Sequence, residues 1–285
     1  GTRGLHTQMR FFESAKEEVL EQQCRGHISV PKDYQNLRDA ISNANPGDRI
    51  EIEAGEHSWD GKIEVNKALH ICGQVDMATG FPTTFLRGRW RITVPPPLPW
   101  DREPLLVGTF SNCWCECIGG YTFAVMGGEW QMYNCRIFCK NGSALSIPNA
   151  VVGLHHCVVG CEKDTNGVIA NYGVVLWEGS KAWISSGSLR NCKHGIFMRD
   201  TADLRVINSE LTRVSIAFGC ILPNDCSIEV LKTRFYEIEH KWHQNSRPSR
   251  LFQEGNYNEK GEPVLVHGDS EGQHVFQTQD LTNRY

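Results

Sequence analysis

The 285-residue sequence lacks several features that would each indicate a class of protein. No apolar run approaches the roughly 18 residues that a membrane-spanning helix needs, so we expect no membrane span. There is no basic excess, because 29 Lys and Arg against 33 Asp and Glu give a formal net charge of −4. This balance argues against a dedicated nucleic-acid or anionic-membrane binder. The first residues, Gly1 to His6, also lack the apolar stretch of a secretory signal.

A repeat of about 22 residues occupies the middle of the chain. We call the residue that marks the same position in each repeat its anchor. The anchors are Asn112, Asn134, His156, Ser186, Asn208 and Lys232, and the steps between them are 22, 22, 30, 22 and 24 residues. An apolar residue stands two positions before each anchor, a small residue directly after it and an apolar residue three positions after it. The long step indicates an insertion near residues 162–168. A repeat of this length cannot bury its apolar face alone, so the coils must stack.

The pattern predicts an all-β fold, a single-stranded right-handed parallel β-helix with a short strand, a sharp bend at the anchor and further strands in each coil. We expect an N-terminal helical extension over residues 1–27, the β-helix over 28–246 and a C-terminal tail or lid over 247–285. Near the start, Tyr34, Leu37 and Ile41 have helical spacing, with Asp33 as the expected N-cap. A helix there would cover the open end of the apolar lumen.

At these residues the chain resembles the pectate-lyase-like superfamily. The segment Val30–Gly55 looks like the opening coil shared by pectin methylesterases and by eukaryotic β-helix domains of the F-box and Shc-binding-protein type. With the later coils, the resemblance covers roughly Ile28 to Trp242. It implies the fold but leaves the function open, because the superfamily contains lyases, hydrolases, esterases and non-catalytic binding domains.

The third strand of each coil is where polysaccharide-active members of this superfamily carry their substrate groove. Alternation of side chains predicts that one set of third-strand residues points outward. Its apolar members are the binding residues that we predict: Phe123, Leu145, Val175, Trp177 and Phe197. Exposed apolar patches of this kind mark interaction sites.

The motifs of polygalacturonases, pectate lyases and pectin methylesterases are absent from the sequence. The best remaining acidic constellation is Glu178 and Asp200, which follow the third strands of adjacent coils, with Arg199 beside them. Two carboxylates about 5 Å apart could divide acid and base roles. Two solvated turn residues are the simpler interpretation.

Six of the twelve cysteines form two columns rather than a metal-binding cluster. The anchor column (Cys113, Cys135 and Cys157) and a second column (Cys117, Cys139 and Cys161) each advance by 22 residues. Stacked columns do not converge tetrahedrally, so we predict no metal site and no cofactor, and interpret these thiols as fillers of a tight core. The histidines, including His155, His194 and the pair His240 and His243, are interpreted as turn or surface residues.

The lead hypothesis is therefore a non-catalytic binding or scaffold domain that engages a protein partner or a second copy of itself through the third-strand sheet. The alternative is a carbohydrate-active enzyme or carbohydrate-binding protein, with Glu178, Asp200 and Arg199 as catalytic candidates. Columns of free thiols favour a reducing compartment, so a cytoplasmic location is expected, with a secreted or organellar location as the alternative if the N-terminus is processed.

Overall fold

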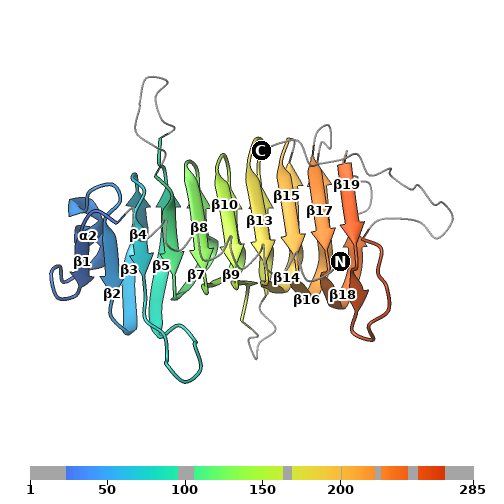
Figure 1. Cartoon of the computed structure of the whole chain (residues 1–285), viewed down its shortest axis with the longest axis horizontal. Helices are drawn as coiled ribbons and strands as arrows, with labels where there is room; N and C mark the ends of the chain where they lie inside the picture. The colour runs from blue at the N-terminus through green and yellow to red at the C-terminus, as the bar shows by residue number, and fades with distance from the viewer. Residues whose placement is uncertain are drawn as a thin grey trace, which may run out of the picture.

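The computed structural model describes residues 24–95, 106–162, 169–199, 201–221, 226–242 and 250–266. In these ranges the chain winds into a parallel β-helix whose strands form two long sheets (Figure 1). In spatial order, the strands of sheet A are β1 (His27–Val30), β2 (Arg49–Ile52), β4 (His70–Cys72), β6 (Gly108–Ser111), β8 (Glu129–Tyr133), β10 (Val151–His155), β13 (Lys181–Ser185), β15 (Asp203–Ile207), β17 (Ser227–Leu231) and β19 (Arg250–Glu254).

Sheet B runs alongside, with its strands also in parallel pairs. Its members are β3 (Gly55–Val65), β5 (Thr84–Ile92), β7 (Cys113–Val125), β9 (Arg136–Ile147), β11 (Val158–Gly160), β12 (Ala170–Leu176), β14 (Ser188–Arg199), β16 (Glu210–Ile221), β18 (Arg234–Trp242) and β20 (Tyr257–Asn258). β11 and β12 both pair with β9 and β14, so together they stand for one long strand that the insertion interrupts.

The bend between sheet A and sheet B falls at the predicted anchors. All six anchor residues have a positive φ, between 47° and 57°. Asparagine adopts this left-handed conformation more readily than most residues. The side-chain amide of Asn134 donates to Oδ1 of Asn112 at 3.0 Å, so the ladder of stacked amides forms where two asparagines are neighbours. The repeat read from the sequence is confirmed.

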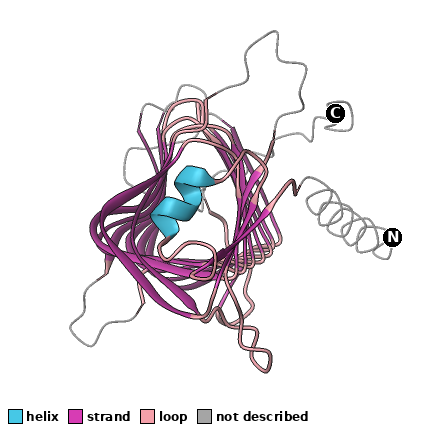
Figure 2. Ribbon diagram, turned by 90° about the vertical axis from the view of Figure 1, so that its left-hand side faces the viewer, coloured by secondary structure: helices cyan, strands magenta, loops and turns pink. Residues whose placement is uncertain are grey.

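A second bend divides the long strands of sheet B. It falls at a positive-φ residue within each strand, at Asn141 in β9, Asn191 in β14, Arg213 in β16 and Glu237 in β18. Each coil therefore has three sides, which Figure 2 shows in cross-section. We call the parts of sheet B after this bend, together with β12, the third strands.

Helix α2 (Leu37–Asn43) lies across the N-terminal opening of the β-helix (Figure 2). It buries Leu37, Ala40 and Ile41 against the first coil, as expected for a helix that covers the lumen. The N-cap is Asn36, whose Oδ1 accepts from the backbone N–H of Asp39 at 2.9 Å. The prediction of Asp33 as the cap is wrong, because its carboxylate instead accepts from the backbone N–H of Ser29.

At the other end, β19 and β20 pair with β17 and β18 and continue both sheets beyond residue 246. Part of the segment expected as a tail therefore belongs to one further coil. Most of the helical extension expected over residues 1–27 lies outside the described residues, as do residues 96–105, the insertion at 163–168 and residues 267–285. No described helix has the length and apolar character needed to cross a lipid bilayer.

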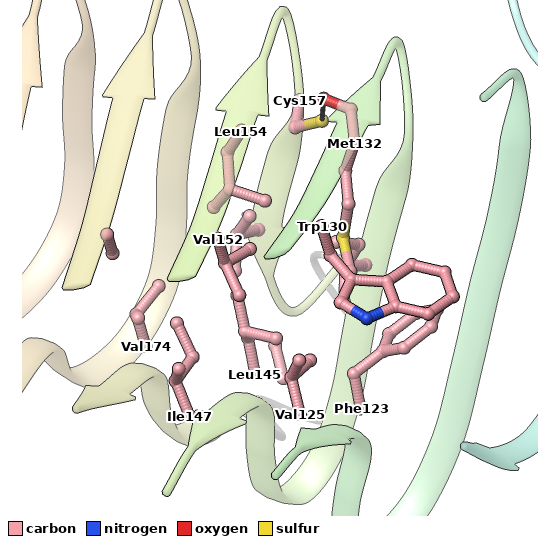
Figure 3. Close-up of a cluster of buried hydrophobic side chains, with 14 of the residues drawn as sticks. Phe123, Val125, Trp130, Met132, Leu145, Ile147, Val152, Leu154, Cys157 and Val174 are labelled. Atoms are coloured by element: carbon pink, nitrogen blue, oxygen red, sulfur yellow. Dashed lines mark hydrogen bonds between the residues drawn. The ribbon is translucent and has the colours of Figure 1, made fainter. Parts of the chain in front are cut away.

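The core of the described residues is one long apolar cluster between the sheets, with a second, small cluster of Cys161, Ala170, Cys192 and Val214. Figure 3 shows part of it, with side chains of both sheets meeting in the interior. The cysteines of the anchor column are at most 1% exposed and belong to this cluster, which confirms them as core-filling residues. In the second column, Sγ of Cys117 and Sγ of Cys139 are 3.5 Å apart; the contact with Cys117, followed by burial, raises the pKa of Cys139.

Candidate functional site

The outer side of the third strands is built from two columns of residues that the strand register aligns. One column is Ala124, Ser146, Val175, Phe197 and Gly219. The other, nearer the second bend, is Tyr121, Ser143, Tyr172, His194 and Ile216. We call this surface the third-strand face. In the described residues, these two columns contain no carboxylate from Tyr121 to Gly219.

Two of the predicted binding residues are not on this face. Phe123 is 1% exposed and Leu145 is fully buried, and both point into the core (Figure 3). Phe123 packs against Phe110, with ring centroids 5.0 Å apart, and against Trp90 at 5.7 Å. Their predicted outward placement is wrong. The register pairs Phe123 with Leu145 and Leu145 with Val174, an inward residue, so the expected phase was off by one residue in these two coils.

The other three predicted binding residues do lie on the outer side. Trp177 and Phe197 are half-buried, whereas Val175 is only 7% exposed and is covered by its neighbours. The face is therefore less apolar than expected, because the residues beside Val175 in the earlier coils are Ala124 and Ser146 rather than large side chains. What remains is a group of aromatic side chains in the coils of β12 and β14, which we call the aromatic cluster. Tyr172, His194 and Phe197 contact one another, and Trp177 lies on the same outer side directly after β12.

Aromatic rings pack closely within this cluster. The Tyr172 ring is stacked on His194, with centroids 4.9 Å apart and planes 19° from parallel, and it contacts Phe197 at 5.4 Å. Sequence analysis did not select Tyr172 or His194 as binding residues. Their separation of 22 residues, one coil of the repeat, was the signal that could have placed them side by side.

A cation lies at the edge of the cluster. The guanidinium of the exposed Arg199 stands over the Trp177 ring, 4.3 Å from its centroid. The indole N–H of Trp177 donates to Ser146 Oγ at 3.1 Å, which fixes the orientation of the ring. This arrangement presents a positive charge beside an immobilised aromatic surface, a combination suited to an acidic ligand that also has an apolar side.

The predicted acid–base constellation is only partly described. Glu178 is exposed in the turn after β12, and Arg199 is engaged with Trp177, while Asp200 lies outside the described residues. Their catalytic roles therefore stay predictions. Within the described ranges, no group of His, Cys, Asp and Glu side chains converges in a way that could hold a metal ion.

Comparison with known proteins identifies the fold. The chain matches no protein-family model and no curated protein by sequence. Among solved structures, rice weevil pectin methyl esterase aligns over 84% of this chain and 90% of its own, with a TM-score of 0.51 and 10% identity. A pectate lyase aligns over 82% of this chain and 74% of its own (TM-score 0.49, 11% identity). The pectin methylesterase of Aspergillus niger aligns over 84% and 87% (TM-score 0.46, 12% identity).

The fold is thus a pectate-lyase-like right-handed parallel β-helix, as the sequence predicted. Identities of 10–12% relate the folds and do not carry over an activity. The closer likeness to F-box and Shc-binding-protein domains stays a prediction.

Proposed function

We propose that the protein is a glycan-binding β-helix and that the glycan lies along the third-strand face. The observation that carries this proposal is the aromatic cluster of Tyr172, Phe197 and Trp177 with Arg199 at its edge. Aromatic rings offer large, rigid apolar surfaces on which the apolar faces of sugar rings can stack. Because Arg199 is exposed and cationic, the cluster favours sugars that carry carboxylates.

The fold favours a glycan as the ligand over a protein partner or a second copy of this chain. Rice weevil pectin methyl esterase, which by its name acts on pectin, has this fold at a TM-score of 0.51. The expected role in binding a protein partner or acting as a scaffold relied on five outward apolar residues. Two of these, Phe123 and Leu145, are in the core and cannot contact a partner. A purely apolar docking surface is therefore the weaker explanation of this face.

Binding is favoured over catalysis because of what surrounds the aromatic cluster. In the column of Val175 and Phe197, the other members are Ala124, Ser146 and Gly219, where a hydrolase would need a pair of carboxylates on one surface. An enzymatic role for Glu178 and Asp200 makes a distinct prediction. Turnover of the glycan would then be measurable, and Glu178→Gln would abolish it while leaving affinity unchanged.

The direct test is binding of polygalacturonate and of the neutral glycan laminarin, measured by affinity electrophoresis and calorimetry. Trp177→Ala should weaken binding of polygalacturonate about tenfold, the loss of roughly one stacking contact. Arg199→Gln should weaken binding of polygalacturonate and leave binding of laminarin unchanged, since only the acidic glycan uses the cation.

Trp183 provides a matched control, because it is a half-buried tryptophan on the outer side of sheet A. Trp183→Ala should bind as the wild-type protein does. If Trp177→Ala retains full affinity, or if Trp183→Ala loses as much, the third-strand face is not the binding surface.

A further inference from the structure

A chain of four hydrogen-bonded side chains crosses the outer face of sheet A. It begins at Glu129 and Gln131 on β8, continues to His155 on β10 and ends at Ser185 on β13. Gln131 Nε2 donates to Glu129 Oε1 at 3.1 Å, and Gln131 Oε1 lies 2.8 Å from His155 Nε2. Ser185 Oγ lies 2.8 Å from His155 Nδ1. These residues come from three successive coils, so no short motif in the sequence joins them.

The chemistry of the groups fixes the direction of each hydrogen bond. A carboxylate only accepts, so the NH₂ of Gln131 must face Glu129 and its amide oxygen must face His155. That oxygen also accepts, so Nε2 of His155 carries the hydrogen. In the neutral imidazole the lone pair is then on Nδ1, where it accepts the hydroxyl proton of Ser185. A serine whose proton points at an oriented imidazole is the arrangement of an activated nucleophile.

These hydrogen bonds, which we call the relay, need a glycine at one position of sheet A. Gly153 stands between Gln131 and Trp183 in the register of sheet A. A Cβ there would lie 2.0 Å from Gln131 Oε1 and 2.9 Å from His155 Nε2, so only glycine lets these atoms meet above the strand. Gln131 is 2% exposed, so its amide is held in place by its surroundings.

The imidazole is held on its face as well as at its edges. The Tyr133 ring is stacked on His155, with centroids 4.9 Å apart and planes 15° from parallel. His155 and Ser185 are directly paired across β10 and β13, which sets their separation by backbone register. Both are half-buried rather than enclosed, so a reagent can reach the hydroxyl.

We propose that Ser185 is a nucleophile toward ester carbonyls, that His155 is its general base, and that Gln131 and Glu129 are positioning residues. Because Ser185 lies on the outer face of a sheet, the substrate class is an ester presented at the surface of a larger molecule. The site uses strands of sheet A, so it stands or falls independently of glycan binding on the third-strand face.

The reaction is a two-step acyl transfer. Ser185 Oγ adds to the carbonyl carbon as its proton passes to His155 Nδ1; the bond to the leaving alkoxide breaks, and the alkoxide takes that proton to become the alcohol. Water then attacks the acyl-serine, giving a proton to His155 Nδ1, and Ser185 recovers a proton as the carboxylic acid departs. The sum is ester plus water to acid plus alcohol.

The experiment treats the full chain with a fluorophosphonate probe, which is attacked by activated serines with loss of fluoride, and follows the adduct by intact mass and peptide mapping. A single adduct on Ser185 is expected, formed about a hundredfold more slowly when His155 is replaced by Asn. Ser185→Ala should remove the adduct. Ser186→Ala, at the exposed neighbouring serine, should label as the wild-type protein does.

Hydrolysis of p-nitrophenyl acetate gives a second readout, with a burst of p-nitrophenol that Ser185→Ala removes. Gln131→Leu removes the acceptor for Nε2–H of His155 and should lower the labelling rate about tenfold. The double variant Glu129→Gln, Gln131→Glu exchanges the two groups, keeps both hydrogen bonds and the net charge, and should retain labelling. Absence of an adduct in the wild-type protein, or equal labelling of the folded Ser185→Ala variant, overturns the proposal. Equal labelling of the two Gln131 variants overturns the positioning role.

Discussion

Phe123 and Phe197 lie on third strands of the same sheet, one on its inner side and the other on its outer side. The inner column that contains Phe123 continues through Leu145, Val174 and Ile196, each of them fully buried. The outer column that contains Phe197 includes Ala124 and Ser146. The inner column must fill the lumen in every coil, so its members are all large. The outer column has large side chains only near the aromatic cluster, which indicates that those residues serve a purpose other than packing.

Alanine at these two positions should give the largest difference between the columns. Phe123→Ala leaves a cavity beside Trp90 and Phe110 and should lower the free energy of unfolding by about 3–5 kcal/mol. Phe197→Ala removes a half-buried ring and should cost less than about 1 kcal/mol. Urea unfolding monitored by circular dichroism measures both. Similar losses for the two variants would mean that the outer cluster is structural and would weaken its assignment as a binding surface.

The bends at the anchors join sheet A to sheet B and belong to neither column, and changes there should have intermediate effects. Asn134→Ala removes the hydrogen bonds to Asn112 Oδ1 and to the carbonyl of Gly80, and places alanine at a φ of 49°. We expect a loss of about 1–2 kcal/mol.

Ser186 occupies the equivalent bend with a φ of 52° but outside the asparagine ladder. Ser186→Gly relieves the left-handed strain at some cost in chain entropy and should stabilise the protein by about 0.5 kcal/mol. Thermal unfolding of the two variants compares the bends. Destabilisation by Ser186→Gly as large as that by Asn134→Ala would show that serine contributes more to the bend than tolerance of its conformation.

The anchors were predictable from the sequence because each leaves a local signature, a small residue after the bend and apolar residues at fixed offsets. Which residues of the third strands point inward could not be predicted, because the odd and the even positions are both apolar in segments such as Val174–Trp177. The second bend could not be predicted from the sequence either, since residues as different as Asn141, Arg213 and Glu237 adopt the positive φ there. The relay that ends at Ser185 depends on register between coils, which only the repeat spacing of 22 and 30 residues encodes.

The last expected effect depends on pH and concerns His70, an outward-facing residue of sheet A that is nevertheless buried. Burial, followed by the charge of Arg49, lowers the pKa of His70 below its ordinary value of 6.5, and its Nδ1 lies 3.1 Å from Thr109 Oγ1. The folded protein therefore binds a proton at His70 less readily than the unfolded chain does. The stability from the neutral form is fully present above pH 6.5 and is lost as the pH falls below it.

One proton of this kind changes the free energy of unfolding by at most about 1.4 kcal/mol per pH unit. Between pH 7.5 and pH 5.5, we expect the wild-type protein to lose up to about 1 kcal/mol more stability than His70→Asn, whose amide can still reach Thr109. Urea unfolding of both proteins at the two pH values measures this difference. If the two lose stability in parallel, His70 takes up its proton in the folded protein as easily as in the unfolded chain, and its burial on the outer side of sheet A carries no electrostatic cost.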